Sequence, residues 1–137
     1  MIKHDIRSRQ DVELMVNTFY DKVRQHHSIG PFFNEIITDW SEHLSKLADF
    51  WETNLFFVKA YKGNPLRAHL SVDQHFNNEI EQAHFGHWLQ LWFETLDDLF
   101  EGKNKELAKE RARSMAHIMF LRIFQAKDHK EHLQIKP

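Results

Sequence analysis

One histidine stands in an unusual setting near the middle of the chain, within the segment GNPLRAHLSV at residues 63–72. Residues 63–65 (Gly-Asn-Pro) interrupt any preceding helix, and His69 follows in a short apolar run with Leu66 and Leu70. A run this short is a poor helix by itself, and a buried histidine needs a partner for each ring nitrogen. A metal ion bound to one nitrogen would be such a partner and would anchor the segment.

Three further side chains carry polar groups in otherwise apolar surroundings, namely Tyr20, His43 and Trp88. Each has an ordinary explanation when it is taken alone. Tyr20 can keep its ring inside and its hydroxyl in water, His43 can lie at the core boundary, and Trp88 can be a large core residue. Taken with His69, however, they favour one shared site over four unrelated positions.

Helices must position these side chains, because apolar residues recur at helical spacing almost throughout the chain. The first helix is predicted to begin after Ser8, its N-cap, and to end at residues 28–31. The compact apolar pattern of residues 32–37 predicts a short helix. The core face of the first helix is predicted to consist of Val12, Met15, Val16, Phe19 and Val23.

A second long helix is expected over residues 40–61, with Thr38 or Asp39 as its cap and the break at residues 63–65 as its end. His43 lies on one side of this helix with Leu47, Phe50 and Trp51. The buried stripe of the helix is predicted to comprise Trp40, Leu44, Leu47, Trp51, Leu55 and Val58.

Two more helices complete the prediction. One ends at Gly102 and has the apolar stripe Ile80, Phe85, Trp88, Leu89, Trp92, Leu96 and Leu99. The last begins near Asn104 and has the stripe Leu107, Ala112, Met115, Ile118, Met119 and Ile123. No alternating strand pattern occurs, so we expect a single all-α domain over residues 1–137. Its core should span about 8–126, and the polar C-terminal tail at 127–137 should be frayed.

Composition narrows the function. With 18 basic and 20 acidic residues the formal charge is −2, which argues against a nucleic-acid surface. No apolar stretch approaches the roughly 20 residues of a membrane span, and the N-terminus lacks a signal-peptide core, so we expect a cytoplasmic protein. The absence of cysteine excludes disulfides and thiol catalysis. Twelve Phe, four Trp and 11 His suggest a wide flat pocket for a large ligand, and a metal.

The order and spacing of several short motifs resemble those of a known family. The chain resembles the truncated haemoglobins of the third group, which are two-on-two globins without the glycine motifs of their relatives. The resemblance runs from about Val12 to Phe124. It rests on Phe19–Val23 (FYDKV), Gly30–Asn34 (GPFFN), Trp40 through His43, Phe50-Trp51, Pro65 with His69-Leu70, His84-Phe85 and Trp88-Leu89.

This resemblance implies a truncated globin fold around haem b, an iron protoporphyrin IX held without a covalent bond. It implies that His69 is the axial iron ligand on the proximal side and that the neighbouring Leu70 helps to seat it. Tyr20 and Trp88 would donate hydrogen bonds to a diatomic ligand, and His43 would gate the pocket. Phe33 would pack on the haem face, and Leu47, Phe50 and Trp51 would line the distal wall. By sequence, Lys46, Tyr61 and Arg67 are the nearest candidates to meet the haem propionates.

Two strong donors suit oxygen delivery badly, because a carrier must release its ligand. The expected function is therefore redox chemistry of oxygen and nitric oxide, with carbon monoxide as a further ligand and a reductase as a possible partner. A haem-based gas sensor or a ligand-binding module without turnover is the alternative. A non-haem iron bundle would need Glu-x-x-His twice, and the motif occurs once, at Glu81 and His84. The histidines at 4, 26, 27, 75, 87, 117, 129 and 132 are expected on the surface.

Overall fold

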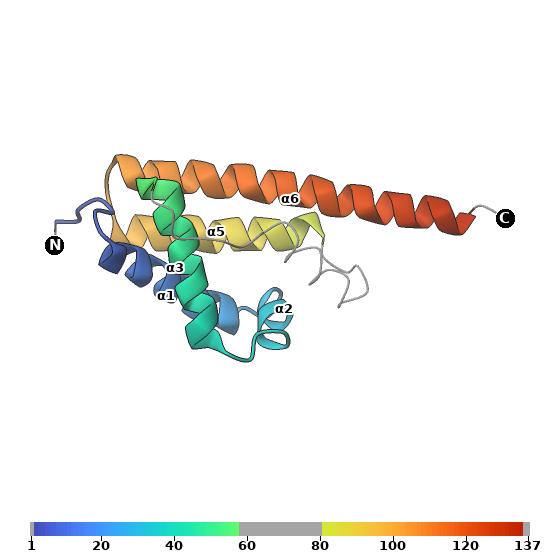
Figure 1. Ribbon diagram of the computed structural model, residues 1–137, viewed down its shortest axis with the longest axis horizontal. Helices are drawn as coiled ribbons and strands as arrows, with labels where there is room; N and C mark the ends of the chain where they lie inside the picture. Colours follow the sequence, from blue (N-terminus) through green and yellow to red (C-terminus); the bar gives the residue numbers. More distant parts are fainter. Residues whose placement is uncertain (1, 58–80, 136–137) are drawn as a thin grey trace.

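The computed structural model describes residues 2–57 and 81–135. Within these ranges the chain forms five α-helices and no strand (Figure 1), as the sequence predicts. The helices are α1 (Arg9–Gln25), α2 (Gly30–Asn34), α3 (Trp40–Phe56), α5 (Gln82–Leu99) and α6 (Lys103–Ile135). No helix in the described ranges is long and apolar enough to cross a membrane.

Helix α1 follows its predicted pattern. The Ser8 hydroxyl caps it by accepting a hydrogen bond from the Asp11 N–H at 3.3 Å. All five residues of the predicted core face are fully buried, and Tyr20 beside them is 6% exposed. One face of α1 therefore supplies both core residues and the first candidate site residue.

Helix α2 begins at Gly30, two residues before the predicted short helix. Pro31 in its first turn has the φ that a helix start needs. Gly30 lies close against the end of α1, because a Cβ there would come 3.0–3.1 Å from the carbonyl oxygens of Arg24 and Val23. This close approach presses α2 against α1.

Helix α3 has Asp39 as its cap, accepting from the Glu42 N–H at 3.1 Å. The predicted end near residue 61 is wrong, because α3 ends at Phe56. Phe57 takes a left-handed conformation with φ of 60°, and its N–H donates to the Thr53 carbonyl. The predicted stripe residue Val58 lies outside the described residues.

The turn between α5 and α6 is fastened by the N-terminal segment. Gly102 has φ of 141°, and a Cβ there would meet the Asp5 side chain at 2.5–2.7 Å. The Asp5 carboxylate accepts hydrogen bonds from the Asn104 N–H at 2.8 Å and the Lys105 N–H at 3.0 Å. Asp5 therefore caps a helix that begins about a hundred residues later in the chain.

Helix α6 runs for 33 residues to Ile135, so the prediction of a frayed tail from about Lys127 is wrong. No Gly or Pro occurs between residues 103 and 135, so nothing in the sequence interrupts the backbone hydrogen bonds. Ile118, predicted to be buried, is 53% exposed. The buried face includes three predicted stripe residues, Ala112, Met119 and Ile123, together with Ala108 and Ala116.

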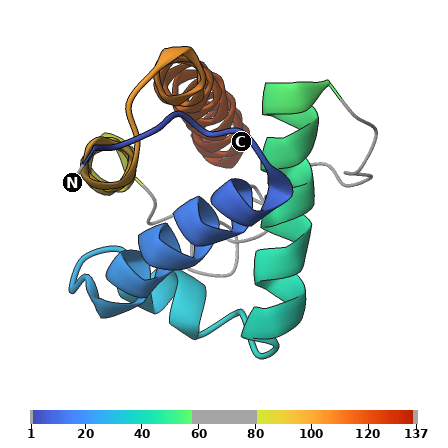
Figure 2. The ribbon, with the colours of Figure 1, turned by 90° about the vertical axis from the view of Figure 1, so that its left-hand side faces the viewer.

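The helices form two pairs packed against each other, α1 with α3 and α5 with α6. In Figure 1, α5 and α6 run side by side in opposite directions while α3 crosses them. Figure 2 looks along α5 and α6 and shows α1 and α3 as the other layer. The structure thus has the two-on-two arrangement.

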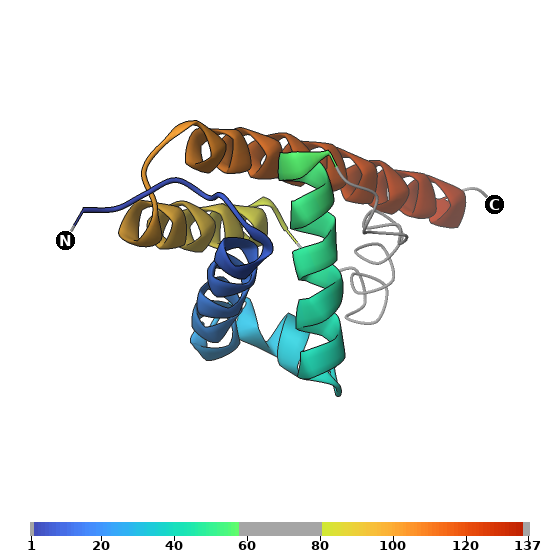
Figure 3. The same ribbon diagram turned by 60° about the vertical axis from the view of Figure 1, so that its left-hand side comes forward.

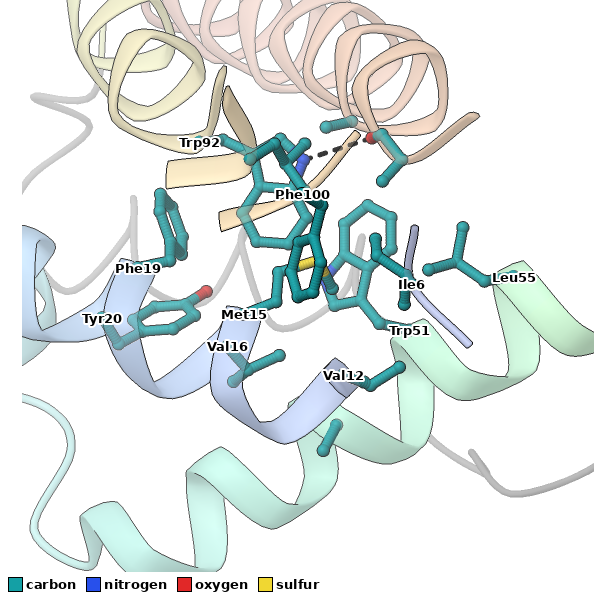
Figure 4. Packing of buried hydrophobic residues seen from close by; sticks show 14 of the residues in the cluster. Ile6, Val12, Met15, Val16, Phe19, Tyr20, Trp51, Leu55, Trp92 and Phe100 are labelled. Atoms are coloured by element: carbon teal, nitrogen blue, oxygen red, sulfur yellow. Dashed lines mark hydrogen bonds between the residues drawn. The ribbon is translucent and has the colours of Figure 1, made fainter. Parts of the chain in front are cut away.

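Two stacked tryptophans join the layers in the core (Figure 4). Trp51 of α3 stacks on Trp92 of α5, with ring centroids 4.5 Å apart and planes inclined by 25°. The Trp92 indole N–H donates to the Ala108 carbonyl of α6 at 3.1 Å. Because this buried donor is paired, Trp92 is a fully satisfied core residue.

Candidate functional site

The ring of Tyr20 lies at the centre of an aromatic cluster drawn from three helices. Its centroid is 5.8 Å from that of Phe33 on α2, 5.9 Å from His43 on α3 and 6.1 Å from Trp40 at the start of α3. The planes of Tyr20 and His43 meet at 88°. Three of the predicted site residues, Tyr20, Phe33 and His43, are therefore brought together by the packing of α1, α2 and α3.

Burial sets the protonation state of Tyr20. Removal of its hydroxyl from water raises the pKa above its usual value of 10.0, because the charged phenolate loses hydration. The nearby Trp88 indole lowers the pKa and so offsets part of this rise. Tyr20 is therefore a neutral phenol across the physiological range and keeps an O–H that can donate.

Trp88 of α5 approaches Tyr20 but does not reach hydrogen-bonding geometry. Its Nε1 is buried and has no hydrogen-bond partner among the residues that the structure describes. The ring is held by an edge-on contact with Phe19 at 5.5 Å and by a parallel stack on Trp92 at 6.0 Å. A buried donor without a hydrogen-bond partner lowers stability. Its presence at Trp88 therefore suggests a functional role rather than a purely structural one.

His43 lies on α3 with its ring edge-on to two aromatic neighbours, Tyr20 and Trp40. The Trp40 contact has centroids 5.7 Å apart and planes at 88°. The Nε2 atom of His43 is shielded from solvent, although the residue as a whole is half-buried. The imidazole thus points into the cluster.

The predicted distal-wall residues differ in how far they are buried. Leu47 and Phe50 are half-buried and pack at the edge of the core, whereas Trp51 is 2% exposed and lies in the stack with Trp92. Lys46, the predicted propionate partner, is exposed and forms an ion pair with Glu42 at 3.2 Å.

Four predicted site residues lie outside the described residues, namely Tyr61, Arg67, His69 and Leu70. In the described ranges no group of three or more His, Asp or Glu side chains could hold a metal ion. The Glu81 and His84 pair serves a different purpose, because His84 Nδ1 accepts the Glu81 N–H at 2.8 Å and caps α5. Helix capping thus explains the one Glu-x-x-His motif of the sequence, and the motif no longer supports a non-haem iron site.

The sequence did not reveal two features beside the site. Arg24 places its guanidinium 4.4 Å from the Trp40 ring centroid, a contact between residues 16 positions apart. His26 is half-buried rather than on the surface, and its ring lies 5.1 Å from that of His27 and 4.8 Å from that of His87. The adjacent pair His26-His27 at a predicted helix end was the available signal for this cluster.

Comparisons with known proteins agree with this geometry. No protein-family profile matches the chain. The chain is 29% identical over 119 residues to a group 3 truncated haemoglobin of Campylobacter jejuni, and the match covers 84% of this chain and 90% of that protein.

Two crystal structures are similar in fold. A group III truncated haemoglobin from Campylobacter jejuni superposes with a TM-score of 0.79 and 28% identity, covering 89% of this chain and 95% of that one. A group II truncated haemoglobin from Bacillus anthracis gives a TM-score of 0.68 at 28% identity, covering 83% and 85%. Sequence and fold agree, and the chain is similar in both to the group III truncated haemoglobins.

Proposed function

We propose that this chain binds haem b without a covalent bond and uses it for redox chemistry of oxygen and nitric oxide rather than for oxygen delivery. The observation that carries the proposal is the convergence of two buried, uncharged donors, the Tyr20 O–H and the Trp88 N–H. The relatives, which are named as truncated haemoglobins, support the cofactor.

The described residues fit a flat aromatic cofactor. Phe33, Leu47 and Phe50 are half-buried around Tyr20 or at the edge of the core, so each has surface left for a further contact. The Trp88 N–H gives a second reason, because a ligand beside it would satisfy a donor that has no partner among the described residues. His69, with Leu70 beside it, would bind the haem iron; Leu47, Phe50 and Trp51 would line the haem pocket; and Lys46, Tyr61 and Arg67 would meet the propionates.

When bound, haem supplies an iron that holds a diatomic gas and exchanges an electron with it. The role of Tyr20 and Trp88 is to hold that gas by hydrogen bonds. Each bond in a water-poor pocket contributes about 1–3 kcal/mol, which slows release by roughly 5- to 150-fold. Slow release favours reaction with nitric oxide, with a reductase restoring the iron, over carriage. Carbon monoxide, a poor hydrogen-bond acceptor, serves as the probe of the site.

The axial ligand is tested by absorption spectra of His69→Ala in the ferric, ferrous and carbonyl forms. We expect loss of stable haem binding, with recovery on addition of imidazole. The matched variant His75→Ala removes the other histidine of residues 58–80 and should keep the wild-type spectra. A histidine-ligated ferrous spectrum in His69→Ala would overturn the assignment.

The redox role is tested separately by mixing the oxygen-loaded protein with nitric oxide. Nitrate formed in proportion to the nitric oxide added, with the ferrous spectrum regained on addition of a reductase and its electron donor, supports turnover. Simple exchange of one gas for the other would favour a gas sensor or a ligand-binding module.

A further inference from the structure

A surface pocket is lined by residues at the end of α1, in and just after α2, and at the start of α3. Figure 3 shows these segments near one another at the bottom of the view, with the α5–α6 turn at the upper left. Its volume is about 610 Å³. The residues that line it are Asp21, Arg24, Gln25, Asn34, Ile37 and Trp40. All except Ile37 and Trp40 are exposed, so the pocket is open to solvent.

Trp40 separates this pocket from the donor cluster. One side of the residue lines the pocket, and its ring also contacts Tyr20 at 6.1 Å and His43 at 5.7 Å between centroids. Tyr20 itself is 6% exposed. Among the residues that the structure describes, half-buried Trp40 thus both lines the open pocket and contacts the Tyr20 ring.

Arg24 restrains Trp40. Its guanidinium carbon lies 4.4 Å from the Trp40 ring centroid, which is the geometry of a cation–π contact. The backbone at Arg24 is fixed as well, because its carbonyl accepts a hydrogen bond from Asn34 Nδ2 at 2.9 Å. The wall of the pocket is thus braced from α1 and α2 together.

We propose that Trp40 is a gate for diatomic gases and that Arg24 holds this gate closed, so that the pocket is a route to Tyr20 separate from any movement of His43. This inference rests on the proposed gas-binding function. An uncharged diatomic molecule is small enough to pass when one indole ring shifts, whereas a larger ligand would need a larger opening.

Carbon monoxide association, followed by stopped flow on the haem-loaded protein, tests the gate. Trp40→Ala should raise the association rate about tenfold, and Trp40→Phe, which keeps a smaller ring, should raise it less. Arg24→Gln should raise it about two- to fivefold, the factor that a cation–π contact of ~0.5–1 kcal/mol corresponds to. Unchanged rates in both Trp40→Ala and Arg24→Gln would overturn the proposal.

The matched control is Arg113→Gln, which removes a similar contact at 5.1 Å from the Phe93 ring on the α5–α6 pair. This variant should leave the rate unchanged, and an equal rise there would also overturn the proposal. Wild-type protein that bound no haem or carbon monoxide would refute the proposed function instead, which separates the two failures.

A second readout needs no gas. The chain has two tyrosines, so protein labelled with ¹³C at the tyrosine ζ carbon gives two resonances, and Tyr20→Phe assigns them. If Trp40 keeps water from Tyr20, Trp40→Ala should lower the Tyr20 pKa towards 10.0, because desolvation is the main cause of its rise. Arg113→Gln should not change it. An unchanged Tyr20 titration in Trp40→Ala would show that Trp40 is not the barrier.

Discussion

The guanidinium of Arg9 on α1 and the carboxylate of Asp49 on α3 lie 2.6 Å apart. Arg9 also lies 3.4 Å from Glu52, one turn further along α3. These contacts fix the crossing of α1 over α3 at the end opposite to α2. Because both helices are rigid over this distance, the same crossing sets where Tyr20 meets His43. The predictions below concern that meeting point and the elements that hold it.

Removal of one donor should release oxygen faster. Tyr20→Phe keeps the buried ring but deletes the hydroxyl, so we expect oxygen dissociation to rise about 5- to 150-fold, the factor for one lost hydrogen bond of ~1–3 kcal/mol. Trp88→Phe should act in the same direction. Flash photolysis or stopped-flow displacement measures both rates, and carbon monoxide dissociation is the control. Equal changes for the two gases would indicate altered access rather than lost hydrogen bonds.

Replacement of His43 should affect binding more than release. Its ring points into the cluster beside Tyr20, while Tyr20 and Trp88 already supply two donors. We therefore expect His43→Ala to raise the carbon monoxide association rate and to change oxygen dissociation little. An unchanged association rate, or fast oxygen loss in the variant, would contradict this gate.

Acid should weaken the start of α2 through His26. Its Nδ1 accepts the Ser28 N–H at 3.1 Å and the Ile29 N–H at 3.4 Å, and a proton on Nδ1 would remove both bonds. Desolvation, with His87 and His27 nearby, holds the His26 pKa below its usual 6.5. The unfolded chain therefore binds the proton first, and stability should fall as the pH drops below about 6.5.

His26→Asn tests this expectation, because its side-chain oxygen can still accept a backbone N–H without titrating. Thermal unfolding between pH 5 and 8 should show a smaller loss of Tm in acid for this variant than for the wild type. The exposed His117→Asn is the control and should keep the wild-type slope. An unchanged slope in His26→Asn would assign the acid sensitivity to other histidines.

Loss of the Asp5 carboxylate should destabilise the whole chain. Asp5→Ala leaves the Asn104 and Lys105 N–H groups without their acceptor, so we expect a fall of about 1–2 kcal/mol in the free energy of unfolding. Urea denaturation measures it. The control Asp98→Ala removes an exposed ion pair with Lys22 at 3.3 Å and should cost less than about 1 kcal/mol. Similar losses of unfolding free energy in the two variants would show that the Asp5 cap contributes no more than an exposed ion pair.

The elements that the sequence predicted well are those with one buried face and a local cap. Helix α1 is such a case, since Ser8 and five regularly spaced apolar residues define it. The end of α3 was missed because Phe57 adopts a left-handed conformation that its residue type does not signal. Ile118 was misplaced because the buried face of α6 runs through Ala112, Ala116, Met119 and Ile123, and position 118 lies off that face.

The candidate site likewise has parts that the sequence predicted and a part that it did not. Tyr20, His43 and Trp88 were identified by residue type and order, and the structure brings Tyr20 and His43 into contact and places Trp88 close to Tyr20. The contact of Arg24 with Trp40 was not predictable, because it depends on the angle between α1 and α3 rather than on any local pattern.

The Asp5 cap also has a consequence for synthesis on the ribosome. Asp5 emerges about a hundred residues before the backbone groups that it caps at Asn104 and Lys105. During translation the Asp5 carboxylate therefore lacks these two donors until the start of α6 leaves the exit tunnel. The nascent chain cannot close its fold from the N-terminus onward, and its last long helix completes the attachment of its first residues.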